Sequence, residues 1–316
     1  YLTRVADQLA DLTGLGEALV GAVFLGSVTS LAGIITSVVA AFNDHPELAM
    51  SNAIGGIAAQ TVFLSIADIA YARSNLEHAA ASFANLMYGV LLIGLLSLVL
   101  IGSSGPELTV FSVHPLSLLL IVLYIAGSKL ISSAKEKPMW RPRVTVDTVK
   151  DVPEGNTIRD SSLSRAVPMF IVLAFIVASG GYCVAKSGMA IADQTFLSEG
   201  FVGVLFTAVA TSLPELIVAI SAVRQKALTL AVSNIIGGNT FDVLFVAFAD
   251  MAYSKGSILH AITQQQTFIV ALTMLMTSAL ILGLLHREQK GIGKIGWESC
   301  LIILLYLAGN AFLLWG

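Results

Sequence analysis

Long apolar runs, each of about 20 residues, follow one another along almost the whole chain. Each run is long enough to cross the hydrocarbon core of a bilayer as a helix, where every backbone group must be paired within its own segment. Only 12% of the 316 residues are charged, whereas soluble domains carry roughly 25%. The sequence therefore predicts an all-α, multi-pass protein of the lipid bilayer. The expected helices are 17–41, 47–71, 79–102, 115–133, 167–187, 199–223, 227–252, 258–285 and 295–315.

Positive charge is distributed unevenly among the connecting loops. The stretch from Lys129 to Arg165 holds eight of the seventeen Lys and Arg residues, and loops rich in these residues stay on the cytoplasmic side of a membrane. The polar, Pro-rich segment 134–165 is therefore predicted to be a cytoplasmic loop of a protein in the cell (inner) membrane. Counting spans outward from this loop leaves only Lys186 and Lys255 on the opposite side.

The loop divides the chain into a first membrane half, 1–133, and a second, 166–316, and both halves contain the same pattern. Residues 17–72 align with 199–254 without a gap, at a constant offset of 182, and 21 of the 56 positions are identical. Chance similarity between apolar helices would not align polar residues in this way. Residues 182 positions apart are called repeat mates below. Polar identities include Glu17/Glu199, Thr29/Thr211, Ser30/Ser212, Asn52/Asn234 and Asp68/Asp250.

The two copies are predicted to cross the membrane in opposite directions. The helix 17–41 would run from inside to outside, and its mate 199–223 from outside to inside. Such inverted-topology repeats are typical of secondary transporters that alternate access around a site at the bilayer midplane. The helix 167–187 precedes the second copy, but only a short stub precedes the first. We therefore expect an original first helix before Tyr1 and a plan of five plus five helices.

Polar residues of the second copy lie at membrane depth. Glu215 belongs to the motif "TSLPEL", and a carboxylate inside the membrane is costly and functional by default. Pro214 lacks a backbone donor, so it is expected to kink or break its helix and free the carbonyl of Ala210. The motif "SNIIGGNTFD", residues 233–242, surrounds a Gly-Gly pair that would permit a second break. Carboxylate, hydroxyl and carbonyl oxygens are the ligands that hard cations such as Na⁺ and Ca²⁺ prefer.

The motifs "TSLPEL" and "SNIIGGNTFD" resemble the second α-repeat of the sodium/calcium exchangers, within the calcium:cation antiporter superfamily. The resemblance implies ten helices with discontinuous central helices around a cation site. Glu215 and Asp242 fall on the family's glutamate and its partner aspartate, and Thr211 and Ser212 fall on its hydroxyl ligands. The implied cation ligands are Glu215, Asp242, Thr211, Ser212, Thr29, Ser30, Gln60, Asn234 and Asn52.

The first copy departs from the family pattern. Gly33 stands where a glutamate is expected, and Gln60 where an asparagine or aspartate is usual. Only two carboxylates remain, and they could balance one divalent ion, two monovalent ions or protons. The transported cation is therefore left open among Ca²⁺, Na⁺ and H⁺.

Three functions follow from these features. The first is a Na⁺/Ca²⁺-exchanger-like cation antiporter that acts by alternating access, with inorganic cations as its partners. The second is a proton-coupled exchanger, or one for monovalent or other divalent cations. The third is a non-transporting binding or regulatory relic, because half of the site is degraded. The sequence contains no nucleotide loop, nucleophile motif or nucleic-acid patch, so we expect no enzyme, no cofactor and no nucleic-acid partner. The oligomeric state is not set by the sequence.

Overall fold

The computed structural model describes residues 28–71, 75–80, 82–136, 143, 163–225, 227–288 and 295–315. These residues are almost entirely helical and contain no β-strand, apart from one isolated bridge between Val110 and Val113. The first half contains α3 (Leu31–Phe42), α4 (Pro46–Ala70), α5 (Leu76–Ala79), α6 (Phe83–Ser104) and α7 (Pro115–Glu136). The second half contains α8 (Leu163–Gln194), α9 (Glu199–Phe201), the π-helix η1 (Val202–Thr207), α10 (Ala208–Arg224), α11 (Leu228–Asp242), α12 (Leu244–Ala252), the 3₁₀ turn η2 (Ile258–His260), α13 (Gln264–His286) and α14 (Trp297–Trp315).

Eight helical segments in the described part of the chain are long and apolar enough to cross a membrane, and α3 is a shorter apolar helix. The prediction of an all-α multi-pass membrane protein is therefore confirmed. Three predicted helices have wrong boundaries. The helix expected at 167–187 spans Leu163–Gln194, so it begins inside the predicted loop. The helix expected from 79 begins at Phe83, after the short helix α5, and the helix expected from 258 begins at Gln264. At the latter, Thr263 and Gln266 form a capping box that fixes the first turn.

The central helices are discontinuous, but not where the sequence placed the breaks. Helix α4 runs unbroken through its Gly-Gly pair, and α11 runs through the mate pair to end at Asp242, with a turn at Val243. In the first copy, Ser30 is the turn residue before α3. The expected break at Pro214 is also absent, because α10 continues through it. Membrane helices tolerate proline where neighbouring groups satisfy the freed backbone.

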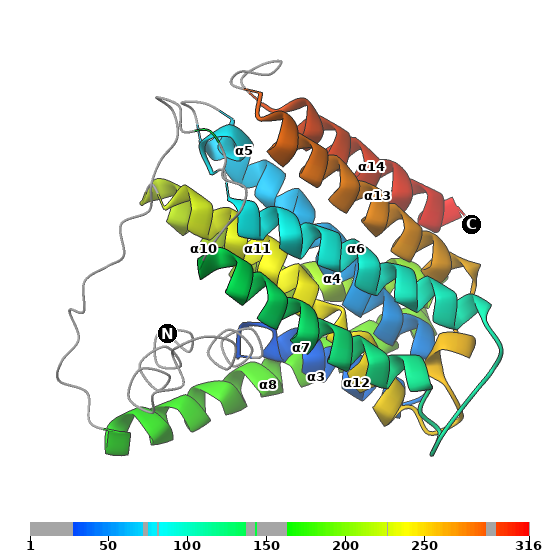
Figure 1. The fold of residues 1–316 in the computed structure, drawn as a ribbon. Helices are drawn as coiled ribbons and strands as arrows, with labels where there is room; N and C mark the ends of the chain where they lie inside the picture. Colours follow the sequence, from blue (N-terminus) through cyan, green and yellow to red (C-terminus); the bar gives the residue numbers. More distant parts are fainter. Residues whose placement is uncertain are drawn as a thin grey trace.

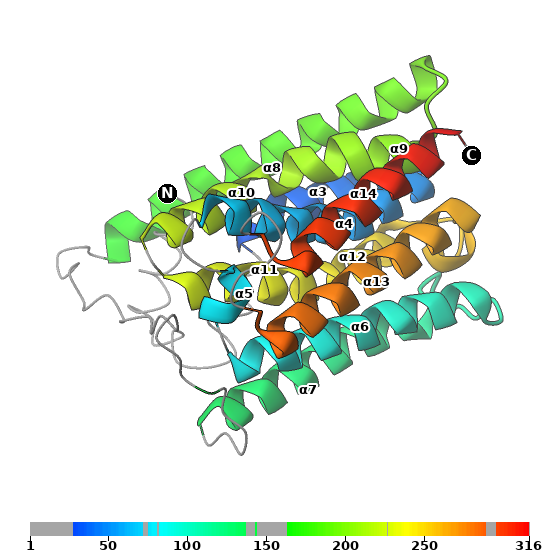
Figure 2. The ribbon, with the colours of Figure 1, turned by 90° about the horizontal axis from the view of Figure 1, so that it is seen from above.

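The helices form a bundle with α4, α10 and α11 near its centre. Seen from above, α8 lies along one edge and α7 along the opposite edge, with α6 next to α7 (Figures 1 and 2). Helix α8 packs closely on α3. A Cβ at Gly181 would lie 2.5 Å from the carbonyl oxygen of Ala32, and Thr36 Oγ1 donates to the carbonyl of Gly181 at 2.9 Å. The glycine lets the two backbones approach, as small residues do between membrane helices.

The repeat is visible in space through two buried aspartates that are mates. Asp68, at the end of α4, accepts hydrogen bonds from the N–H groups of Leu76 and Gly296 and from Ser299 Oγ. Asp250, at the end of α12, accepts from the N–H groups of Ile258 and His114 and from Ser117 Oγ. Every donor to Asp68 is the mate of a donor to Asp250. The offset of 182 thus continues to α7 and α14, whose first residues, Pro115 and Trp297, are themselves mates.

Contacts between loops show which loops share an end of the bundle. Arg287 Nη1 donates to the carbonyl of Arg143 at one end. At the other end Lys255 pairs with Asp44, and Lys186 Nζ donates to Asn43 Oδ1 at 3.0 Å. This grouping agrees with the predicted alternation of spans. The end with Arg143 is called the inner end below, following the distribution of positive charge. Most of the predicted loop 134–165 lies outside the described residues.

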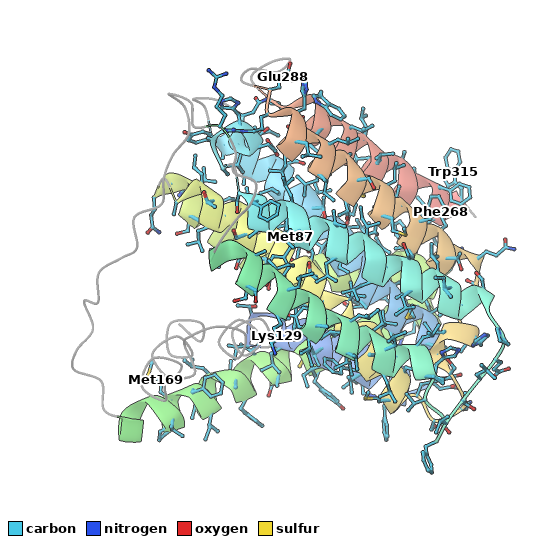
Figure 3. All side chains as sticks on the ribbon, in the orientation of Figure 1. Met87, Lys129, Met169, Phe268, Glu288 and Trp315 are labelled. Carbon is cyan, nitrogen blue, oxygen red and sulfur yellow. The ribbon has the colours of Figure 1, made fainter. Side chains whose placement is uncertain are left out.

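The helices α13 and α14 are antiparallel neighbours along one side of the bundle. Figure 3 labels Phe268 and Trp315 together at the outer end of this pair and Glu288 at the inner end. Phe268 stacks on Phe312 with ring centroids 4.8 Å apart. Trp315 is exposed, as expected for an aromatic residue at a membrane interface.

A carboxyl pair is buried at the inner end. Glu77 of α5 is 1% exposed and hydrogen-bonds to Glu298 of α14, with Asp68 nearby. Burial, together with the charges of Asp68 and Glu298, raises the pKa of Glu77 well above its usual range. This pair lies apart from the polar residues at the centre of the bundle.

Candidate cation site

The centre of the bundle holds a direct contact between two repeat mates. Gln60 of α4 donates through Nε2 to Asp242 Oδ2 at 2.7 Å. Ser30, at the turn before α3, donates to the other oxygen, Asp242 Oδ1, at 2.5 Å. Asp242 is 1% exposed and Gln60 3%. Because mates meet only near the axis that relates the two copies, predicted ligands from both repeats, namely Ser30, Gln60 and Asp242, come together here.

Glu215 is the second carboxylate, buried on α10 at 6% exposure. Its carboxylate is close enough to that of Asp242 for the two charges to repel each other. Ser212, one turn earlier on α10, faces α4. Its Oγ lies 3.4 Å from Gln60 Nε2 and 3.5 Å from a Cβ built at Gly56. The two carboxylates, Ser30, Gln60 and Ser212 therefore form one polar centre at the core of an apolar bundle.

Several oxygens here are buried without a hydrogen-bond donor. Among the described residues, Glu215 Oε2 and Gln60 Oε1 have no partner, and neither have Asn52 Oδ1 on α4 and Asn239 Oδ1 on α11. Buried acceptors are normally paired, because leaving them unpaired costs about 1–3 kcal/mol each. A cation satisfies acceptors of this kind, and the mixture of carboxylate, amide and hydroxyl oxygens suits a hard cation.

The remaining predicted ligands are divided. Thr211 is buried, but its hydroxyl donates back to the carbonyls of Thr207 and Ala208, so the structure does not join it to the carboxylates. Asn52 is 1% exposed and donates to Ser37 Oγ and to the carbonyl of Gly33, which fixes α4 against α3. Asn234 is half-buried two turns before Asp242, and no described hydrogen bond joins it to either carboxylate. Thr29 is half-buried one residue before Ser30.

Two residues near the site were not among the predicted ligands. Asn239 lies in the motif "SNIIGGNTFD" and donates to Thr61 Oγ1 at 3.1 Å, which ties α11 to α4. The signal available in the sequence was its place in that motif, three residues before the predicted ligand Asp242. Phe245 of α12 contacts Gly33, and a Cβ added to Gly33 would lie 2.6 Å from its ring. No pattern in the sequence indicates this contact.

Equivalent residues of the two copies differ in burial around the site. Gly55 of α4 is buried, and a Cβ there would lie 2.7 Å from the Cα of Val204. Its mate Gly237 is half-buried, and a Cβ there would meet no atom of the described residues within 4 Å; the mate of Val204, Ala22, lies outside the described residues. Asn52 and Asn234 differ in the same direction. Helix α4 starts at the outer end and α11 at the inner end, so within the described residues the less buried of the two segments lies in the inner half of the bundle.

This chain is similar to known membrane proteins in sequence and in structure. Inner membrane protein YrbG of Escherichia coli strain K12 is 22% identical over 320 residues, covering 93% of this chain and 87% of that protein. The structure of the H⁺/Ca²⁺ exchanger CAX matches with a TM-score of 0.66 at 14% identity, covering 99% of this chain and 81% of that chain. The sodium-calcium exchanger NCX_Mj matches with a TM-score of 0.57 at 18% identity, covering 98% and 92%.

The family assignment comes from the sequence over most of its length. The family described as sodium/calcium exchanger protein matches residues 1–128 and 165–315, which include both copies of the repeat. Both matched segments contribute residues to the polar centre: Ser30 and Gln60 come from the first, and Ser212, Glu215 and Asp242 come from the second. The chain belongs to the sodium/calcium exchanger family.

Proposed function

We propose that this protein is a secondary active cation antiporter of the sodium/calcium exchanger type. The proposal rests on the buried oxygens without donors beside the carboxylates of Glu215 and Asp242. A buried carboxylate needs a counter-charge or a proton, and unpaired acceptors need a cation or a donor. Bound cations of the transported kind would supply both. The retained carboxylates in a membrane interior also favour transport over a purely structural role.

The charged ligands in this proposal are Glu215 and Asp242, with Gln60 Oε1 and the Ser212 hydroxyl completing the shell. Ser30 holds Asp242 in place through its 2.5 Å hydrogen bond. Thr211, Thr29, Asn52 and Asn234 are supporting residues. Thr211 bonds to its own helix, and the two asparagines lie about two turns before Gln60 and Asp242 on α4 and α11.

Alternating access would follow from sliding of α8 against the repeat core. Helix α8 lies at the edge of the bundle (Figure 2) and touches α3 through Gly181 and Thr36. Gly181 gives this contact a close backbone surface without a large side chain, and a shift of α8 along it would break the hydrogen bond from Thr36.

The test is flux through the full chain in proteoliposomes, with Ca²⁺, Mg²⁺, Na⁺, K⁺ and pH gradients varied separately. Glu215→Gln should abolish cation exchange. Glu107→Gln, in an exposed loop, is the matched control and should leave exchange intact. Undiminished exchange in Glu215→Gln would contradict the site.

A proton-coupled exchanger is the second candidate, and one observation favours it. The first copy contributes no carboxylate to the described site, so only Glu215 and Asp242 balance the charge of the bound cations. Uptake driven by pH without Na⁺ would support this candidate. The absence of flux, together with no rise in Tm on adding cations, would instead support a non-transporting relic.

A further inference from the structure

The side-chain volume next to Gly33 is occupied by Phe245. A Cβ at Gly33 would lie 2.6 Å from Cε2 of this ring and 3.3 Å from Cζ. Contacts below 3.0 Å essentially never occur for real Cβ atoms, and packed interiors leave little room for a ring to move. No side chain larger than hydrogen fits at position 33 while Phe245 keeps its place.

The ring of Phe245 is held by a row of aromatic neighbours. Phe245 packs edge-to-face on Phe241, with ring centroids 6.3 Å apart, and Phe241 packs in the same manner on Tyr124 at 5.7 Å. All three residues are buried. Edge-to-face pairs add stability beyond the area that they bury, so this row fixes the ring against α3.

The second copy shows what the same place looks like without this row. The mate of Gly33 is Glu215, and the mate of Phe245 is Phe63, so a phenylalanine and a glutamate coexist there. The mate of Phe241, however, is Ala59. Phe63 therefore has no aromatic ring at the position from which Phe241 supports Phe245. The two copies therefore differ in two ways: Gly33 replaces a glutamate, and the ring of Phe245 is supported by Phe241.

We infer that Phe245, positioned by Phe241, is a selectivity determinant that limits the site to the two carboxylates of the second repeat. The inference rests on the proposed function, since it concerns the cations that the site accepts. A site with one carboxylate fewer binds divalent cations less tightly, because the number of charged ligands sets their affinity. Because the ring of Phe245 occupies the space next to position 33, a glutamate introduced there would not become a third carboxylate ligand.

A double-mutant cycle on Gly33 and Phe245, called the packing cycle below, tests the contact between these two residues without any ion. Gly33→Ala should lose several degrees of Tm in the natural chain and none in a Phe245→Ala background, where the added methyl group has room. Double-mutant cycles isolate a pairwise coupling of this kind. An equal loss in both backgrounds would overturn the inference, whatever the protein transports.

Calcium binding tests the selectivity. The full chain in detergent is titrated with CaCl₂, and the rise in Tm gives an apparent Kd. Gly33→Glu/Phe245→Ala should bind Ca²⁺ at least about tenfold tighter than Phe245→Ala, as expected for an added carboxylate ligand. Gly33→Glu alone should show no gain.

Two results of the titration would overturn the inference: an equal gain from Gly33→Glu alone, or equal affinity of the double variant and Phe245→Ala. The proposed function fails by a different result, which is unchanged flux in Glu215→Gln. The packing cycle therefore remains decisive even if the site is not a transport site.

Discussion

The removal of Asp250 should cost more stability than an ordinary substitution in a membrane helix. Its carboxylate accepts from two backbone N–H groups at 2.7 Å, those of His114 and Ile258, and from Ser117 Oγ at 2.6 Å. Asp250→Ala leaves both N–H groups buried without acceptors, at about 1–3 kcal/mol each, and also loses the hydroxyl bond. We expect a loss of roughly 3–5 kcal/mol in the free energy of unfolding, a large share of the 5–15 kcal/mol typical of a folded protein. Reversible unfolding in mixed micelles measures this difference.

Two variants serve as comparisons for this value. Ser117→Ala removes one donor and leaves Asp250 with its two N–H partners, so it should cost only about 1–2 kcal/mol. Asp68→Ala breaks the equivalent clamp at the inner end, which joins α4 to α5 and α14, and should cost about as much as Asp250→Ala. If Asp250→Ala cost no more than Ser117→Ala, the backbone bonds would not be the source of stability and the reasoning would be refuted.

Three further results are expected. Gly55→Ala should destabilise by about 1–3 kcal/mol because its Cβ would overlap the backbone of α4's neighbour η1, and its mate Gly237→Ala, where no described atom lies within 4 Å, should cost less, both by thermal unfolding. In a chain without its native cysteines, Asn234→Cys should react with a membrane-impermeant thiol reagent added at the inner side, and Asn52→Cys should not; equal labelling would contradict the difference in openness. Because folding raises the pKa of Glu77, the folded state keeps a proton that the unfolded chain releases above about pH 4.5, so stability is full below that pH and falls by about 1.4 kcal/mol per pH unit as pH rises toward the folded pKa. Glu77→Gln should flatten this slope above about pH 4.5, and an unchanged slope would assign the proton to another group.

Much of the fold could be predicted because two signals are local in the sequence. Apolar runs identify membrane helices, and the offset of 182 identifies equivalent positions. The offset predicted that Asp68 and Asp250 are equivalent, and the structure shows that they bind equivalent donors. The carboxylate of Glu215 stood out for a similar reason, since a charge within an apolar run is visible without any structure.

The breaks in the helices could not be predicted, because a glycine serves two purposes. It permits an unusual backbone conformation, and it also permits close approach of two helices. The Gly-Gly pairs suggested breaks, but Gly55 lies in an unbroken helix against Val204. The actual turns are at Ser30 and Val243. Local sequence does not distinguish the two uses, since the difference depends on which helix lies opposite.

The same limit applies to the site. Gln60 and Asp242 were predicted as separate ligands, but their direct hydrogen bond follows from the way the two copies face each other. Gly33 was recognised as a missing carboxylate, whereas the ring that fills its place comes from α12, 212 residues away. A helix pattern tells which face is apolar and not which residue of another helix meets it.

An inverted repeat also supplies its own control, because a feature required by the fold should occur in both copies. The mates of Glu77 and Glu298 are Leu259 and Leu116. These leucines pack together at the outer end, both within 3.2 Å of a Cβ built at Gly102. The fold is therefore satisfied by an apolar pair at this position, and the carboxyl pair at the inner end is not a structural requirement. For this reason we expect Glu77→Gln to keep the fold while it loses the pH dependence, and a variant that failed to fold would show that the two copies are not equivalent there.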